Sequence, residues 1–106
     1  MTNFADMLSK AKVMQDKMKE AQDQIKKIEV EGKAGGDLVT VTLTGDYELK
    51  KITISEEAKK ENHEIINDLI IAAYNNAKEN LKKKSAEELA KVTGGLNLPS
   101  DFKLPF

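Results

Sequence analysis

Apolar residues recur at alternating steps of three and four along the first quarter of the chain. The set is Phe4, Met7, Ala11, Met14, Met18, Ala21, Ile25 and Ile28. This a/d spacing, with mostly charged and amide side chains between, predicts one long amphipathic helix over residues 4–27. Its apolar stripe is narrow and suits another helix better than a broad core. Two partners fit: the second helical stretch of this chain, or the same helix in another copy.

The hydrophobic period then shortens to two residues, which predicts three antiparallel strands over residues 28–54. Val39, Val41 and Leu43 share one side of the central strand. Gly32–Gly36 is expected to be a hairpin connection, since it matches neither phosphate-binding glycine pattern. Gly45-Asp46 predicts a second tight turn of the Gly-X type, and the slipped parity at Lys50-Lys51 predicts a bulge or a twist.

A helix-start signal at Asn62 opens a second long amphipathic stretch, predicted as a helix over residues 62–92. Its expected buried face is Ile65, Ile66, Leu69, Ile70, Ala73, Ala77 and Leu81. Gly94-Gly95 should end this helix. The tail over residues 96–106 contains two prolines and is expected to be extended. Its alternating apolar residues would suit docking on a surface; they are Leu98, Phe102, Leu104 and Phe106.

The order of these elements predicts a single α+β domain over residues 1–106, with the arrangement α-β-β-β-α. Helices of about 24 and 30 residues would be roughly 36 and 45 Å long, whereas strands of about eight residues span only ~26 Å. The helices must therefore overhang the sheet. An overhanging apolar seam and open sheet edges predict a homodimer with a shared β core and projecting helical arms.

The amino-acid composition limits the classes of function that the chain can have. The net charge is −1, and all 17 basic residues are Lys. Without Arg the chain lacks the usual bidentate reader of guanine, so any nucleic-acid contact should favour the phosphate backbone over the bases. The sequence has no Cys, which suits a reducing compartment. No secretory signal or membrane-spanning run is visible, so the expected location is the cytoplasm.

Catalytic chemistry has little support in the sequence. His63 is the only His and lies in a charged first helical turn, where a surface role is expected. The serines have no base constellation, and no residues show metal-ligand spacing. We therefore expect no enzyme activity, no cofactor, no metal site and no small-molecule substrate. Membrane binding by the first helix is also disfavoured, because its polar face mixes charges and it has a single aromatic residue.

Lysines gather on both predicted helices. The segment 1–27 holds six Lys against four acids, and Lys12, Lys19 and Lys26 recur at one heptad position. One interpretation is a solvated face laced with i,i+4 ion pairs; the other is a surface for a polyanion. Near the end of the second helix, Lys78, Lys82, Lys83 and Lys84 also complement the helix dipole.

Four segments of the sequence are distinctive: Met14-Gln15-Asp16-Lys17-Met18, the helix exit Ile28–Gly32, the strand Gly36–Val41 and the ending Leu98–Phe106. Through these segments, and across its whole length, the chain resembles the YbaB/EbfC family of bacterial nucleoid-associated proteins. The resemblance implies a cytoplasmic, tweezers-like homodimer at the nucleoid that binds double-stranded DNA with little sequence preference, and no catalysis.

The resemblance attributes DNA binding to the helical arms. The matching candidates for phosphate contacts are Lys10, Lys12, Lys17, Lys19, Lys26, Lys27, Lys78, Lys82, Lys83 and Lys84. The alternative function is a dimeric, non-enzymatic adaptor, whose seam and apolar tail hold another protein while the lysines only confer solubility. A net charge close to zero favours this alternative.

Overall fold

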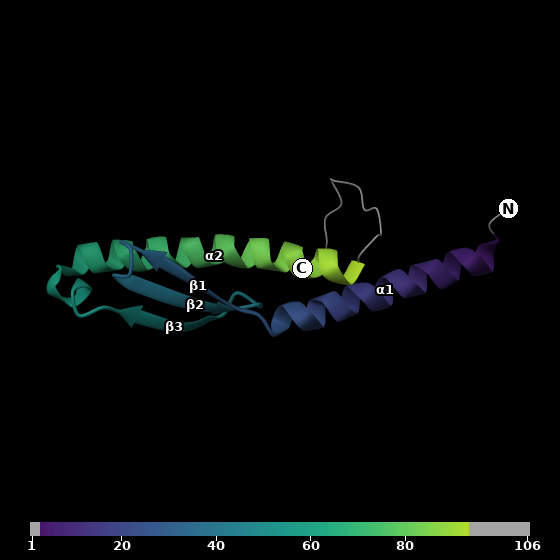
Figure 1. The fold of residues 1–106 in the computed structure, drawn as a ribbon, viewed down its shortest axis with the longest axis horizontal. Helices are drawn as coiled ribbons and strands as arrows, with labels where there is room; N and C mark the ends of the chain where they lie inside the picture. The colour runs from purple at the N-terminus through teal and green to yellow at the C-terminus, as the bar shows by residue number, and fades with distance from the viewer. Residues whose placement is uncertain (1–2, 94–106) are drawn as a thin grey trace.

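A three-stranded antiparallel sheet carries one long helix along its face, and a second long helix projects from one end (Figure 1). The computed structural model describes residues 3–93. The elements are α1 Phe4–Lys26, β1 Glu29–Ala34, β2 Val39–Thr44, β3 Leu49–Ile54, the short 3-10 helix η1 Ala58–Lys60 and α2 His63–Thr93. This order confirms the predicted α-β-β-β-α arrangement. The predicted tail over residues 96–106 lies outside the described residues.

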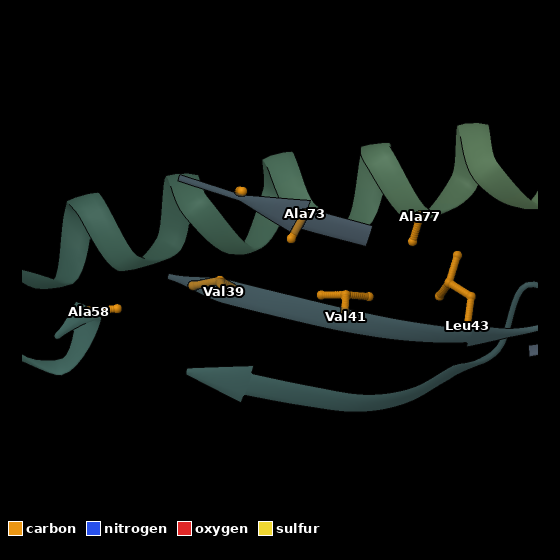
Figure 2. Packing of buried hydrophobic residues seen from close by; sticks show 7 residues of the cluster. Val39, Val41, Leu43, Ala58, Ala73 and Ala77 are labelled. Carbon is orange, nitrogen blue, oxygen red and sulfur yellow. The ribbon is translucent and has the colours of Figure 1, made fainter. Parts of the chain in front are cut away.

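The core lies between α2 and the two strands that it covers, β1 and β2 (Figure 2). Val39, Val41 and Leu43 point from β2 toward α2 and are fully buried, as the alternation of the strand predicts. Ala73 and Ala77 face them from α2 with no exposed surface. Because alanine is short, α2 can lie close to the sheet. The core is therefore built from large residues on the strand and small residues on the helix.

The predicted buried face of α2 is wrong at its first residue. Ile65 is 42% exposed, whereas Ala73, Ala77 and Leu81 are fully buried. At 100° per residue, Ile65 is turned about 80° around the helix axis from Ala73 and about 120° from Ala77. The stripe that touches the sheet is thus narrower than the apolar pattern of the helix.

Gly32 is not part of the turn that the glycine-rich stretch predicted. It lies within β1 and is buried, and the turn follows at Gly35 and Gly36, whose φ angles are 63° and 72°. A Cβ on Gly32 would sit 2.1 Å from the backbone nitrogen of Ala77 and 2.2 Å from the carbonyl oxygen of Ala73. Glycine is required here because the helix backbone passes directly over the strand.

Two asparagines of α2 close the outer edge of β1 on either side of Gly32. The Lys33 backbone N–H donates to Asn76 Oδ1 at 2.9 Å, and Asn80 Nδ2 donates to the Glu31 carbonyl oxygen at 2.8 Å. These backbone groups point away from β2 and would otherwise be open to another strand. The sheet is therefore closed along β1, and its free edge is β3.

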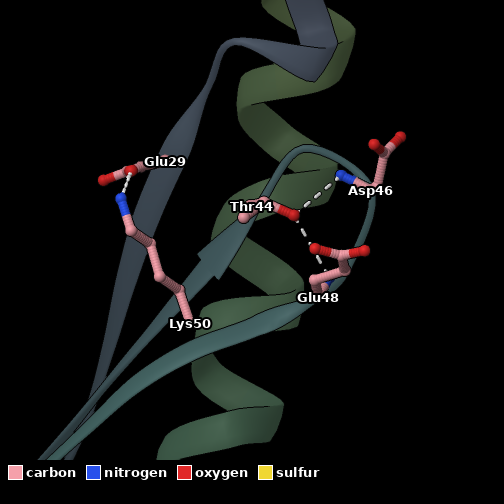
Figure 3. Close-up of polar contacts among 5 residues, drawn as sticks. All are labelled: Glu29, Thr44, Asp46, Glu48 and Lys50. Atoms are coloured by element: carbon pink, nitrogen blue, oxygen red, sulfur yellow. Dashed lines mark hydrogen bonds and ion pairs between the residues drawn. The ribbon is translucent and has the colours of Figure 1, made fainter.

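The connection from β2 to β3 differs from the predicted Gly-X turn (Figure 3). Positive φ occurs at Tyr47, at 64°, and not at Gly45. Tyr47 N–H donates to the Thr44 carbonyl oxygen at 3.0 Å, which makes a three-residue loop of a type I turn followed by a left-handed residue. Thr44 Oγ1 also accepts from the Asp46 and Glu48 N–H groups at 3.3 and 3.2 Å.

The glycine at position 45 and the bulge in β3 are explained by different contacts. A Cβ on Gly45 would lie 1.7 Å from the Ile25 carbonyl oxygen, so the turn abuts the end of α1. Farther along β3, Thr42 pairs with Lys51 but Leu43 pairs with Leu49. Lys50 is thus the extra residue, which confirms the predicted bulge. Its ammonium forms an ion pair with Glu29 of β1 (Figure 3).

Candidate nucleic-acid interface

Helix α1 is the part of the molecule that stands apart from the core. The side chain of Asn3 caps its start by accepting from the Asp6 N–H at 2.8 Å. Its 23 residues make a rod about 35 Å long. Only its C-terminal half packs against α2, where Ala21 and Ile25 are buried. The rest of α1 extends beyond the body as an arm (Figure 1).

The apolar seam of α1 consequently has two halves with different surroundings. Toward the C-terminus the seam packs against α2 of the same chain, which is one of the two partners that the sequence left open. Toward the N-terminus, Phe4 is 73% and Met7 58% exposed, and the neighbouring Leu8 and Val13 are also exposed. This outer half has no cover from the described residues of its own chain. The arm therefore combines bare apolar surface with lysines.

The six lysines of α1 and its C-cap carry free ammonium groups. Lys17 is half-buried; the exposed ones are Lys10, Lys12, Lys19, Lys26 and Lys27. None of the six forms an ion pair with a residue in the described range. The interpretation of this helix as a face laced with i,i+4 ion pairs is therefore wrong. Lys12, Lys19 and Lys26 follow one line of the helix surface at intervals of about 10.5 Å.

The lysines of α2 are in a different electrostatic situation. Lys82 pairs with Glu79 at 3.6 Å, and Lys84 pairs with Glu88 at 3.9 Å. The same Glu88 also forms an ion pair with Lys91, whose Nζ lies 3.4 Å from Glu88 Oε1. Lys78 and Lys83 are exposed and form no ion pair within residues 3–93. Compensation by neighbouring acids makes this end of α2 a weaker anion surface than the arm.

The ten candidate lysines do not form one cluster. Lys26 and Lys82 line the same groove between α1 and α2, so the fold brings these two together. Lys83 and Lys84 line a separate shallow hollow beside β1. Lys10 and Lys12 lie on the outer half of the arm, away from α2 (Figure 1). A single chain therefore offers a row of charges along a rod, and no enclosed anion pocket.

Three lysines outside the two long helices, Lys33, Lys50 and Lys59, form ion pairs with acids. Lys33 Nζ lies 3.1 Å from Asp37, and this hydrogen bond together with the charge of Asp37 raises the pKa of the Lys33 ammonium. Lys59 pairs with Glu56 at 3.0 Å. These pairs are exposed and contribute little to stability. Within the described residues, the lysines without an ion pair are the six of α1 and its C-cap together with Lys51, Lys60, Lys78 and Lys83.

Among residues 3–93, no group of three or more His, Cys, Asp or Glu side chains is placed to hold a metal ion. No helix in this range has the length and apolar character needed to cross a membrane.

Sequence reasoning missed Asn76 and Asn80, which bond to the outer edge of β1, and it missed that Gly45, predicted only as a turn residue, abuts the end of α1. The four-residue spacing of the asparagines on one helix face was a usable signal.

Comparisons with known proteins agree on one family. Residues 1–96 match the profile of the YbaB/EbfC DNA-binding family. The chain is 46% identical to a nucleoid-associated protein of Granulibacter bethesdensis and 44% identical to one of Rickettsia canadensis, with 100% of each chain covered in both pairs. An uncharacterized protein of Helicobacter pylori has the same fold, with a TM-score of 0.71 and 17% identity over 89% of this chain and 100% of its own.

Proposed function

This chain belongs to the YbaB/EbfC DNA-binding family, and we propose on that premise that it binds duplex DNA as a nucleoid-associated protein. The names of its relatives support a place at the bacterial nucleoid, in the cytoplasm. The observation that carries the proposal is the row of unpaired lysines on a helix that projects from the body. The proposed activity is binding, without catalysis and without a cofactor.

The lysines of the arm would contact phosphates and leave the bases largely unread. An ammonium group is a compact point charge on a flexible stem, so it follows the phosphate backbone without the fixed geometry that base recognition requires. Each phosphate that is neutralised releases counterions and adds about 0.9 to the slope of log K against log salt. A few contacts of this kind give binding that is weak in physiological salt and has little sequence preference.

We further propose that the protein acts as a homodimer joined through β3. Leu49 and Ile52 are 49% and 40% exposed, although they share a sheet face with Leu43 and Val41, their fully buried partners on β2. The difference arises because α2 packs mainly on β1 and β2, whereas Leu49 and Ile52 on β3 remain exposed. A second copy placed on β3 would cover these side chains and the free edge of the sheet. Two arms would then face the same DNA, which strengthens binding by avidity.

An adaptor function is the second candidate, and a specific observation favours it. The outer seam of α1 exposes Phe4, Met7, Leu8 and Val13, which is the pattern of a helix awaiting an apolar partner. In that case the lysines serve solubility, and DNA binding is absent or independent of them. Recovery of one stoichiometric protein partner from lysate, with no retention of DNA, would favour the adaptor.

The experiment that separates the two compares matched charge reversals. Lys12→Glu with Lys19→Glu changes two unpaired lysines on the arm, and Lys59→Glu with Lys60→Glu makes the same change in charge at η1, at the far end of the molecule (Figure 1). Binding to random-sequence duplex is measured by fluorescence anisotropy as a function of salt. Lys26 is left unchanged because it lines a groove with α2.

We expect the arm variant to lose most of its affinity at low salt and the η1 variant to stay close to the parent. The arm variant should also show a shallower salt dependence, by about 0.9 for each phosphate that it no longer neutralises. Equal losses in the two variants would mean that net charge alone governs binding. Full binding by the arm variant would remove α1 from the DNA site.

A further inference from the structure

A groove of about 470 Å³ lies where the arm joins the body. The C-terminal half of α1 forms one wall, the last third of α2 forms the other, and the β2–β3 turn closes one end. Its apolar lining consists of Ile25, Tyr47, Ala86 and Leu89, and charged groups on its rim are Lys26, Asp46 and Lys82. This is enough space for one or two large side chains of an extended segment.

The chain itself supplies a segment of suitable chemistry next to this groove. Leu89 lies one helical turn before Thr93, the last described residue of α2, and the sequence continues from there to Phe106. Gly94-Gly95 permits a reversal of direction. The groove residues Leu89 to Lys82 lie about 6 to 16 Å back along the helix axis, at 1.5 Å per residue. An extended chain from Leu96 to Phe102 covers about 20 Å at ~3.3 Å per residue and reaches all of them.

We propose that the segment Leu96–Phe102 of the same chain folds back into this groove, with Leu98 and Phe102 as its apolar anchors. Charge supports this occupant, because Asp101 would arrive between two lysines on the rim, Lys26 and Lys82. Attachment to α2 also gives the segment a high effective concentration at the groove, which a separate peptide lacks. The two prolines in the tail, at 99 and 105, favour an extended form over a helix.

The consequence of this docking is control over the direction of the arm. α1 joins the body through the buried residues Ala21 and Ile25 and through the contact of the Ile25 carbonyl with Gly45. A segment that fills the groove would touch α1, α2 and the β2–β3 turn at once. It would thereby fix the angle at which α1 projects. This role does not depend on DNA binding.

Disulfide trapping tests the position of the tail directly, because the natural sequence has no Cys. Gln22→Cys places one thiol in the groove wall, and Ser100→Cys places the other on the tail, between the two proposed anchors. Gln24→Cys with the same tail thiol is the control, since Gln24 is exposed on α1 outside the groove. We expect the Gln22 pair to form an intrachain bond under mild oxidation, seen as a faster, reductant-sensitive band of single-chain size.

The alternative outcomes of trapping are distinct. A covalent dimer from the Gln22 pair would mean that a second copy's tail occupies the groove, and would overturn docking within one chain. Equal yields from the Gln22 and Gln24 pairs, or no disulfide from either, would overturn docking in the groove.

Fluorescence gives an independent measurement, because the chain has no Trp. Phe102→Trp therefore introduces a single reporter. Its quenching by acrylamide should rise several-fold when Ala86→Glu puts a charge in the groove, and should not change with Asn75→Glu. Ala86 and Asn75 are both exposed on α2, but only Ala86 lines the groove. Equal quenching in the two backgrounds, with both variants folded by circular dichroism, would overturn the proposal.

Discussion

Replacement of Gly32 by alanine should destabilise the fold far more than a change of one methyl group suggests. The new Cβ would lie 2.1 Å from the Ala77 nitrogen and 2.2 Å from the Ala73 oxygen, where an ordinary contact begins at 3.4 Å. Both neighbours are helix backbone, which cannot rotate away as a side chain can. Because a packed interior has no spare volume to absorb the overlap, the strand and α2 must separate by about 1 Å.

The cost of that separation has two parts. Overpacking of a well-packed core costs about 1–3 kcal/mol. The same movement would stretch the hydrogen bonds of Asn76 and Asn80, which are 2.9 and 2.8 Å long and flank Gly32, beyond useful length. Breaking each of these bonds costs about 1 kcal/mol. The expected loss is thus about 3 kcal/mol or more, a large share of the roughly 5–15 kcal/mol typical of small domains.

Gly36→Ala is the matched control. Gly36 has φ +72° and nothing within 4 Å of the position of a Cβ. Alanine there meets only backbone strain of about 1–2 kcal/mol, partly offset by a less flexible unfolded chain. Thermal unfolding is followed by circular dichroism at one protein concentration. The melting temperature of Gly32→Ala should lie about 12 °C or more below that of the parent, and that of Gly36→Ala only a few degrees below it. Equal shifts in the two variants would refute the close approach of helix and strand.

Three further predictions concern the sheet and the arm. Ile52→Asp should convert the proposed dimer to monomer by light scattering while Lys51→Glu, its neighbour on the opposite sheet face, leaves the dimer intact; a dimer in both would exclude β3 as the interface. Asn76→Ala should lower the free energy of unfolding by about 0.5–1.5 kcal/mol, because it removes the exposed hydrogen bond from the Lys33 N–H; an unchanged denaturant midpoint would contradict this. Gly45→Ala should displace α1, since its Cβ would meet the Ile25 carbonyl at 1.7 Å, and should increase amide hydrogen exchange near Ile25; unchanged exchange would show that the turn does not hold the arm.

The sequence predicted the elements because each has a strong periodic signal. The alternation of Val39, Val41 and Leu43 specified the buried face of β2, and the slipped parity at Lys50-Lys51 located the bulge. The cap at Asn62 was equally readable, and Ile65 N–H donates to Asn62 Oδ1 at 2.9 Å. These are local signals, and each depends on residues within a few positions of one another.

The predictions that were wrong concern residues whose role depends on contacts with distant parts of the chain. Gly32 looked like part of a turn, because nothing in its neighbourhood shows that α2, which follows much later in the sequence, will cross it. Gly45 resembled the glycine of a Gly-X turn for the same reason, although its neighbour in space is Ile25. Lysine positions were readable, but whether each lysine has an acidic partner depends on side-chain geometry. Local sequence therefore predicted where the charges lie, and only the fold showed which of them are free.

A net charge of −1 does not argue against DNA binding by this chain, because the opposite charges are unequally placed. The segment 1–27 holds six lysines and four acids, an excess of two positive charges (6 − 4), and none of those lysines is paired within the described residues. Acidic residues are concentrated elsewhere, for example in residues 55–68, which contain five acidic residues and two lysines. The Debye length is about 8 Å at physiological salt, whereas the whole of α1 is about 35 Å long. A phosphate beside the outer arm therefore experiences the nearby lysines and little of the distant acids. Under the proposed function, separation of charge along the 70 Å length of the molecule would allow a nearly neutral protein to bind a polyanion.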